Sequence, residues 1–434
     1  MAWVEPLRAL HYDEAVAGPP QVLVSPPYDV IDDAQRAELA ARSPFNAVHV
    51  DLPVDPDGDD PYAHAARLLG QWRAQGVLTR DPGAALWALR QDYTTPDGAP
   101  MRREGFFARV RVEPYGAGRI RPHERTHPAA KEDRLRLTRA TQVNLSPIFA
   151  LFSDATGVAR QALAPAYEAG PQATVTDEQG TVHQLFRLGD PATITVVTEA
   201  LRPAELLIAD GHHRYETARV YAQEMDAAAS GRDIERPEEG GHHWVLMCLV
   251  ALEDPGLTVF PTHRLVRGTT AEQQEALAAA LRRDFDLEEV ALEEVAPPPG
   301  DGPLTFGYLD SHFRRAFHAT LKDPRTVDHA LGDQPEAYRR LDTAVLETLL
   351  LSGPLELSEE AIAHLERLGY ARDTDEARDL VLRGDYDIGF FLRPAPVQQV
   401  RDVAAAGATM PPKSTFFFPK IPTGLLFNPL SDPE

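Results

Sequence analysis

An apolar segment that ends at an Asp-Gly pair and continues as an amphipathic pattern is the feature that most constrains the fold of this chain. Residues 201–209 predict a β-strand, and Asp210-Gly211 predicts a turn. Residues 212–225 then place apolar side chains on one face of a helix. A strand that leads directly into a helix is typical of α/β structure, so we expect a mixed α/β (α+β) fold.

The N-terminal end of such a helix can bind an anion, because its first N–H groups lack helical acceptors and the helix dipole is positive there. Gly211 would let an oxyanion approach the backbone, Arg214 can reach phosphate oxygens, and Asp210 can orient Mg²⁺ or a hydroxyl group. His212 and His213 add donors. A plain helix cap is the simpler alternative, but three consecutive donor side chains after an apolar strand favour a phosphate site.

Strands and helices also alternate along the rest of the chain. Asp32 or Asp33 caps a predicted helix that runs to Arg42, and residues 47–52 return as a strand. Further strands are predicted at residues 22–24, 85–93, 105–112, 244–252, 304–309, 316–321 and 388–392, and further helices at residues 61–76, 131–140, 271–285, 341–351 and 375–383. Residues 295–302 are rich in proline and resemble a linker, so we expect a catalytic body at residues 1–294 and a C-terminal α/β lobe at residues 303–434.

Charge and cysteine content narrow the function classes. The 434 residues include 43 Lys and Arg against 66 Asp and Glu, a net charge of −23, which disfavours nucleic acid as a partner. A small anion can still bind where a few donors converge. The single cysteine, Cys248, excludes an intrachain disulfide and fits a reducing compartment. Residues 1–10 lack a signal-peptide pattern and the apolar run 244–252 is shorter than the ~18–20 residues that span a bilayer, so we expect a cytoplasmic protein without a membrane partner.

The pentapeptide His123-Glu124-Arg125-Thr126-His127 fits the zinc-peptidase pattern, but Pro122 and Pro128 flank it and disfavour the long helix that such a site needs. We therefore predict that it does not bind zinc. It could instead be a loop that brings Glu124 as a general base, with His123, Lys131 and Arg134 as donors to an anion. A surface loop followed by a solvated helix face is an equal alternative.

The C-terminal segment has two alternative interpretations. Lys413, Ser414, Thr415 and Lys420 flank three consecutive phenylalanines. This arrangement suits either a structural strand or a lid whose lysines reach phosphate.

Residues 206–215 resemble the signature of the ParB/sulfiredoxin superfamily, and the Asp-Gly-His-His-Arg form at residues 210–214 resembles that of the free-serine kinases. This resemblance implies that Gly211, His212, His213 and Arg214 hold nucleotide phosphates. Over its length the chain is similar to the family catalogued as domain of unknown function 1015, on residues 26–31, 123–126, 131–135, 144–149, 210–214 and 413–420. No cysteine lies in the turn, as sulfiredoxin chemistry would need, and no helix-turn-helix is evident, as DNA-loading ParB proteins would need.

These observations predict a ParB/sulfiredoxin-like phosphate-binding core with added layers and a smaller C-terminal lobe. By resemblance, the expected function is a nucleotide-dependent kinase that uses ATP or ADP with Mg²⁺ on a small hydroxylated metabolite, free L-serine, or the reverse reaction on O-phosphoserine. A phosphohydrolase and a nucleotide-gated binding protein are the alternatives. The expected catalytic residues are Glu124, Asp210 and His213, with Asp210 as Mg²⁺ ligand. The expected phosphate-binding or nucleotide-binding residues are Gly211, His212, Arg214, His123, Lys131, Arg134, Lys413 and Lys420.

Overall fold

The computed structural model describes residues 1–96, 98–116, 118–124, 128–229, 240–300, 302–358, 361 and 367–431. The chain forms two compact units. The first unit comprises Met1–Pro122, Thr126–Leu257 and Pro419–Glu434, and the second comprises His123–Arg125 and Thr258–Phe418. The polypeptide therefore leaves the first unit twice and returns to it at its C-terminal end.

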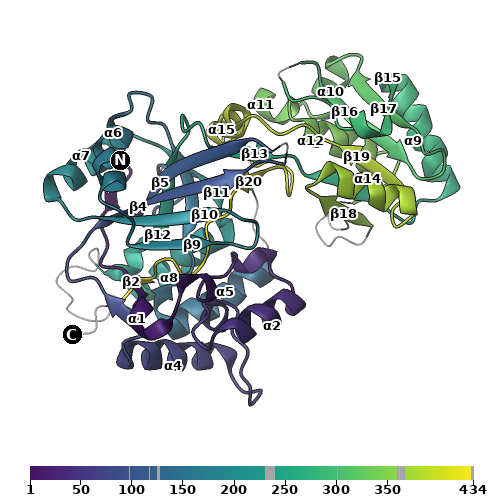
Figure 1. Cartoon of the computed structure of the whole chain (residues 1–434). Helices are drawn as coiled ribbons and strands as arrows, with labels where there is room; N and C mark the ends of the chain where they lie inside the picture. The colour runs from purple at the N-terminus through teal and green to yellow at the C-terminus, as the bar shows by residue number, and fades with distance from the viewer. Residues whose placement is uncertain are drawn as a thin grey trace. The chain divides into compact units, whose positions relative to one another are not determined.

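A mixed sheet of nine strands forms the centre of the first unit (Figure 1). Its order is β6-β11-β8-β12-β5-β4-β10-β9, with β1 beside β5. β11 is parallel to β6 and β12 is parallel to β8, while the other pairs are antiparallel. The strands are β1 (Val4–Glu5), β4 (Leu86–Thr94), β5 (Pro100–Arg111), β6 (Ile120–Arg121), β8 (Ile148–Phe152), β9 (Ala173–Thr176), β10 (Val182–Leu188), β11 (Leu206–Asp210) and β12 (Trp244–Ala251).

Helices cover this sheet and bury two apolar cores. The helices of the unit are α1 (Glu14–Ala17), α2 (Asp33–Arg42), α3 (Val48–Asp51), α4 (Pro61–Ala74), α5 (Pro128–Thr141), α6 (Val158–Glu168), α7 (Pro191–Leu201) and α8 (His212–Ala229). The larger core joins α6, α7 and the first turns of α8 to the sheet. A second core joins α4 and α5 to β2 (Leu10–Tyr12), β3 (Leu78–Arg80) and β7 (Val143–Asn144). α5 packs against both α4 and α8, and Figure 1 shows α2, α4 and α5 gathered on one side of the sheet.

Two predicted strands in the N-terminal region are wrong. Residues 47–52 form the one-turn helix α3 because the side chain of Asn46 accepts a hydrogen bond from Val48 N at 2.9 Å and starts the turn. Val48 and Val50 are both buried, so their alternation imitates a strand. Residues 22–24 likewise form no strand, because Val22 ends the 3₁₀ helix η1 (Pro20–Val22) and Leu23 caps it.

The predicted strand at residues 201–209 begins later, because α7 continues to Leu201 and β11 begins at Leu206. The helix predicted at residues 212–225 is confirmed as α8, and the strand predicted at residues 244–252 is confirmed as β12. The strand-to-helix turn at Asp210-Gly211 is therefore present.

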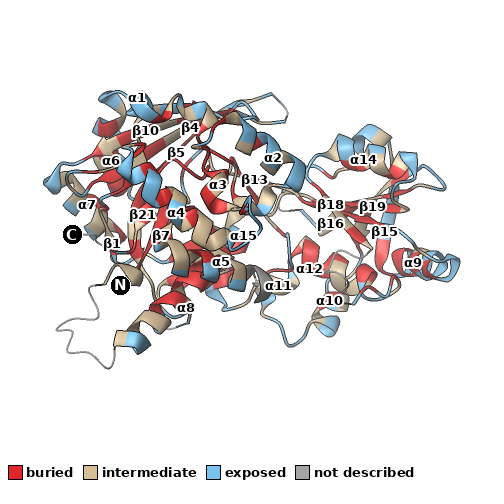
Figure 2. Ribbon diagram, turned by 90° about the horizontal axis from the view of Figure 1, so that it is seen from below, coloured by how far each residue is buried: buried red, intermediate tan, exposed pale blue. Residues whose placement is uncertain are grey.

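The second unit is an antiparallel sheet of six strands in the order β15-β17-β16-β19-β14-β18. The predicted hairpin is confirmed as β16 and β17. In Figure 2 β19 is drawn as buried, whereas α14 has exposed residues on its outer side. The elements are β13 (Thr258–Phe260), β14 (His263–Val266), α9 (Ala271–Asp284), β15 (Phe285–Val290), β16 (Thr305–Asp310), β17 (Ala316–Leu321), α10 (Arg325–Ala330), α11 (Glu336–Arg339), α12 (Asp342–Leu346), the π-helical η6 (Glu347–Leu351), β18 (Leu368–Ala371), α14 (Thr374–Arg383), β19 (Ile388–Phe391), α15 (Val397–Ala405) and β20 (Phe416–Phe418).

The unit boundary differs from the expected linker at residues 295–302. The second unit already begins at Thr258, and the last segment from Pro419 onward belongs to the first unit. Val295 is fully buried in the second unit, and a Cβ atom at Gly307 would lie 1.8 Å from its carbonyl oxygen. The start of the proline-rich segment therefore packs against β16 instead of separating two domains.

Within the described part of the chain, no helix has the length and apolarity needed to cross a membrane.

Candidate functional site

The candidate site lies where β11 ends and α8 begins. Leu206 to Ala209 are buried, and β11 lies between β6 and β8 in the sheet. Gly211 follows with φ +94°, a conformation that side-chain-bearing residues rarely adopt. A Cβ atom there would also lie 2.9 Å from Nε of Arg214, so glycine lets the guanidinium lie directly against the turn.

Asp210 lies between two cations. Its Oδ2 accepts from Arg214 Nη2 at 2.6 Å, and its Oδ1 accepts from Lys420 Nζ. Burial alone would raise the pKa of Asp210, but Lys420 and Arg214 together hold that pKa well below its usual range. Burial opposes the charge of Arg214 as well, yet Asp210 raises the pKa of this arginine. Asp210 and Arg214 are therefore both charged at neutral pH.

One donor of Arg214 has no acceptor among the residues that the structure describes. Arg214 is 10% exposed, and its Nη1 donates to the carbonyl oxygen of Pro147. Its Nε is buried and has no hydrogen-bond partner in that part of the chain. An unpaired buried N–H group is uncommon in folded proteins, so this atom is a candidate donor to a bound anion.

The backbone around Lys420 is held by two buried side chains of the sheet. Arg103 donates to the carbonyl oxygen of Pro419, and Gln91 Nε2 donates to that of Lys420 at 3.2 Å. Gln91 Oε1 in turn accepts from Arg103 Nε at 2.9 Å. These contacts fix the C-terminal segment so that Lys420 meets Asp210.

A tyrosine ring lies beside both Arg134 and Arg214. Tyr28 belongs to the 3₁₀ helix η2 (Tyr28–Val30), which follows two prolines. The guanidinium carbon of Arg134 is 4.2 Å from the centroid of this ring, and that of Arg214 is 6.0 Å away. Burial raises the pKa of Tyr28, so the phenol stays neutral. The next residue, Asp29, is exposed and close enough to Arg214 to raise the pKa of that arginine.

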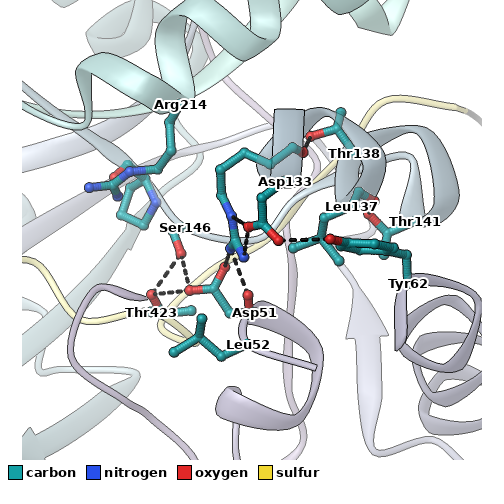
Figure 3. A network of polar contacts seen from close by, with 12 residues as sticks. Asp51, Leu52, Tyr62, Asp133, Leu137, Thr138, Thr141, Ser146, Arg214 and Thr423 are labelled. Carbon is teal, nitrogen blue, oxygen red and sulfur yellow. Dashed lines mark hydrogen bonds and ion pairs between the residues drawn. The ribbon is translucent and has the colours of Figure 1, made fainter. Parts of the chain in front are cut away.

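Arg134 is occupied by partners within the protein. Its Nη1 donates to Asp51 O at 2.6 Å, and its Nε donates to Asp133 Oδ2 at 2.8 Å. The buried Asp51 carboxylate also accepts from Ser146 Oγ at 2.7 Å and from Thr423 Oγ1 at 3.2 Å (Figure 3). The cavity beside this network is about 40 Å³, enough for a water molecule but too small for an amino acid. The network therefore braces the site.

The expected site residues His123, Glu124 and Lys413 belong to the second unit. His123 is buried, its Nε2 lies 2.9 Å from Thr415 Oγ1, and its ring lies edge-on to Phe417. Oε1 of Glu124 lies 3.9 Å from the same Nε2. Lys413 is exposed, and its carbonyl oxygen accepts from Arg264 Nη1 at 3.1 Å.

The structure thus brings Asp210, Gly211, Arg214 and Lys420 together in the first unit. His212 is buried and His213 half-buried in the first turn of α8, and Lys131 lies half-buried on α5, where its carbonyl oxygen is 3.5 Å from Thr217 Oγ1. The second half of the pentapeptide, residues 125–127, lies outside the described residues, so the expectation that it does not bind zinc stays a prediction.

Asp210 is poorly suited to hold Mg²⁺ in this arrangement. Each of its oxygens accepts from a cationic side chain, and the sum of Asp210, Arg214 and Lys420 is one positive charge. A divalent cation would be repelled here unless both side chains moved. A role of Asp210 as a Mg²⁺ ligand would therefore require Arg214 and Lys420 to move away from it.

A comparison with protein families decides the membership of the chain. The model described as "Protein of unknown function (DUF1015)" matches residues 4–344. The chain belongs to this family. The matched residues include Tyr28, Asp51 and the turn between β11 and α8. The family description gives no activity.

Solved structures share a distant likeness with this DUF1015 member. A conserved hypothetical protein from Pyrococcus furiosus is 15% identical over 73% of this chain and 93% of its own, with a TM-score of 0.36. A free serine kinase in complex with AMP is 13% identical over 72% and 86%, also with a TM-score of 0.36. SbnI from Staphylococcus aureus, truncated at its C-terminus, is 11% identical over 75% and 87%, with a TM-score of 0.37. These likenesses are too distant to assign residue roles, and comparison with curated proteins gave no match.

Sequence reasoning missed several residues of the site in this DUF1015 member. Tyr28, Asp29, Asp51, Ser146 and Thr423 surround the two arginines. Two of the segments that carried the family resemblance, residues 26–31 and 144–149, contain three of them. The Pro26-Pro27 pair was the available signal for Tyr28 and Asp29, because each proline fixes its φ angle and makes the turn before them rigid.

Proposed function

We propose that this protein is a nucleotide-dependent phosphotransferase that holds phosphate groups at the turn between β11 and α8. The observation that carries this proposal is the buried Nε of Arg214, which lies against Gly211 and has no acceptor among the described residues. Leaving such a donor unpaired costs about 1–3 kcal/mol, and a phosphate oxygen would supply the missing acceptor.

Local charge supports the same proposal. Arg214, Lys420 and Asp210 sum to one positive charge, although the chain as a whole has a net charge of −23. The positive end of the α8 dipole adds to this local potential. A small phosphate ligand would therefore be attracted to this turn, whereas a long polyanion would be repelled by the rest of the surface.

ATP or ADP is the proposed phosphoryl donor, and a small hydroxylated metabolite is the proposed acceptor. The resemblance of residues 210–214 to the free-serine kinases makes free L-serine the leading acceptor, and O-phosphoserine the substrate of the reverse reaction. We further propose that β11, the turn and α8 form a ParB/sulfiredoxin-like core. His212 and His213 would then contribute phosphate contacts from the first turn of α8.

In the forward reaction the serine hydroxyl oxygen would form a bond to the terminal phosphorus, and the bond from that phosphorus to the nucleotide oxygen would break. The hydroxyl proton must pass to a base. Glu124 is the base predicted from the sequence. We propose Asp29 as the base instead, because it is an exposed carboxylate in the same unit as Asp210 and acts electrostatically on Arg214.

A nucleotide-gated binding protein is the second candidate function. It is favoured by the engagement of both Asp210 oxygens with cations, which leaves that carboxylate unsuited to metal-assisted transfer. In that case nucleotide binding would shift the population of two conformations, and no phosphoryl group would move.

The test is to incubate the full chain with ATP or ADP and L-serine, and separately with O-phosphoserine, and to detect products by ³¹P NMR and mass spectrometry. We expect phosphoryl transfer between serine and a nucleotide. Turnover of another hydroxylated metabolite would rule out serine as the acceptor but support the proposed transferase activity. Tight nucleotide binding without any phosphoryl transfer would contradict the transferase activity and support the nucleotide-gated binding protein.

A further inference from the structure

A cluster of two histidines and one aspartate lies at the other end of α8. Asp226 is in the last turns of the helix, and His242 and His243 are in the 3₁₀ helix η4 (Gly241–His243) that precedes β12. Nε2 of His242 lies 3.2 Å from Oδ1 of Asp226, and Nε2 of His243 lies 3.1 Å from the same oxygen. The three potential ligand atoms all lie within 4.8 Å of one another.

These separations fit one metal ion better than three independent surface groups. Ligand atoms about 2.0–2.1 Å from a tetrahedral Zn²⁺ are roughly 3.3 Å apart, close to both nitrogen-to-oxygen separations here. Two imidazoles and one carboxylate are a ligand set that divalent transition metals accept. A hydrogen-bonded cluster is the alternative, with both imidazoles donating to one oxygen.

The packing around η4 holds the His242 ring in place. A Cβ atom at Gly240 would lie 2.2 Å from Cε1 of His242, so the ring rests directly on that glycine. A Cβ atom at Gly241 would lie 2.3 Å from the carbonyl oxygen of Leu430. Neither glycine has a positive φ, so close packing rather than backbone conformation requires them. A side chain at Gly240 would displace the His242 imidazole, and one at Gly241 would clash with the backbone of Leu430.

The exposure of the cluster also suits a metal. The two histidine side chains are 14% exposed and that of Asp226 is 44% exposed, so an ion from solution could reach them.

We propose that Asp226, His242 and His243 bind one divalent transition-metal ion, Zn²⁺, with a water molecule completing the coordination. At about 1.5 Å per residue, Asp226 lies roughly 21 Å along α8 from His212. The ion therefore acts apart from the proposed phosphate site. It ties the C-terminal end of α8 to the start of β12, two elements of the first unit.

The test uses the full chain without an affinity tag, freed of metal with a chelator and then titrated with ZnCl₂ by calorimetry. We expect one Zn²⁺ per chain. Asp226→Asn and His243→Ala should each weaken binding by at least about tenfold, since changing residues that merely support metal ligands already costs roughly 10–100-fold. His64→Ala, on α4 of the same unit, is the matched control and should bind as the wild type does.

X-ray absorption at the zinc edge of the wild-type complex gives a reading that does not depend on any variant folding. We expect scattering from two imidazoles and a light oxygen or nitrogen shell. Absence of stoichiometric Zn²⁺ binding, a spectrum without imidazole, or equal affinity in folded Asp226→Asn and His243→Ala proteins would each overturn the proposal. A wild-type protein that binds one Zn²⁺ as expected but transfers no phosphoryl group would support the zinc site and count against the proposed function alone.

Discussion

The guanidinium of Arg214 lies so close to Gly211 that its Nε is 2.9 Å from the position that a Cβ atom at residue 211 would occupy. The glycine has φ +94°, and the arginine is anchored on its other side by Asp210 and by the carbonyl oxygen of Pro147. The pair therefore forms one structural element. It lies at the start of α8, where the helix dipole favours an anion.

Gly211→Ala should impair phosphate binding as well as stability. The positive φ costs roughly 1–3 kcal/mol for a residue with a side chain, and the new methyl group would push the guanidinium from the turn. All four tryptophans, Trp3, Trp72, Trp87 and Trp244, belong to the first unit. Urea unfolding followed by tryptophan fluorescence therefore reports on this unit, and calorimetry with ATP or ADP measures binding.

Gly18→Ala is the matched control for this substitution. Gly18 has φ +95°, and no atom lies within 4 Å of its Cβ position. It should lower the free energy of unfolding through backbone strain without changing nucleotide affinity. Equal nucleotide affinity in folded Gly211→Ala and Gly18→Ala proteins would contradict a phosphate role for the turn.

Arg214→Ala should weaken nucleotide binding by about 1.5–3 kcal/mol, the usual loss for a hydrogen bond to a charged group. Arg219→Ala on the same helix is the control, because Arg219 pairs with Glu216 and lies over Tyr115 instead of facing the turn. Calorimetry on both folded variants checks the difference. If both bind nucleotide as the wild type does, the site lies elsewhere.

The strand-to-helix turn could be predicted from local sequence because both of its signals are local. Apolar burial defines β11, and Asp210-Gly211 marks the turn. Local sequence could not predict that Oδ1 of Asp210 accepts from Lys420. Lys420 reaches it only because Arg103 and Gln91 fix a backbone segment that is distant in sequence.

The division into units could not be derived from linker composition. A proline-rich stretch predicts a boundary only when it stays exposed, and Val295 is buried against β16. The chain passes from the first unit to the second between Leu257 and Thr258, where the sequence has no proline-rich stretch. The alternation of Val48 and Val50 wrongly predicted a strand. The hydrogen bond from Val48 N to the side chain of Asn46 starts a helical turn there and outweighs strand propensity.

Acid should destabilise the first unit partly through Asp210. Burial alone would raise the pKa of this carboxyl, but Lys420 and Arg214 hold it below the usual range. A depressed pKa in the folded state stabilises the protein above the ordinary aspartate pKa of about 3.9 and ceases to do so as the pH falls through the folded value. Unfolding midpoints below about pH 4 should therefore fall more steeply in the wild type than in Asp210→Asn.

Asp59→Asn, which removes an exposed carboxylate of the same unit, is the control and should keep the wild-type slope. At neutral pH, Asp210→Asn should itself cost roughly 3–5 kcal/mol, because two largely buried cations lose their shared counter-charge. A variant as stable as the wild type at neutral pH, with an unchanged acid slope, would refute this account.

Asp29 and Glu124 are the two candidates for the general base, and they belong to different units. Any transfer to a serine hydroxyl needs a positioned acceptor for the proton, and removing a general base usually lowers kcat by about 10²–10⁴. We expect Asp29→Asn to show this loss with nucleotide affinity retained, because Asp29 is exposed, follows the Tyr28 ring and lies near Arg214. Glu124→Gln should then retain most of the wild-type kcat. Steady-state rates of O-phosphoserine formation with saturating nucleotide decide between them. The opposite pattern, with Glu124→Gln inactive and Asp29→Asn active, would restore the base predicted from the sequence and require Glu124 to act at the turn during turnover.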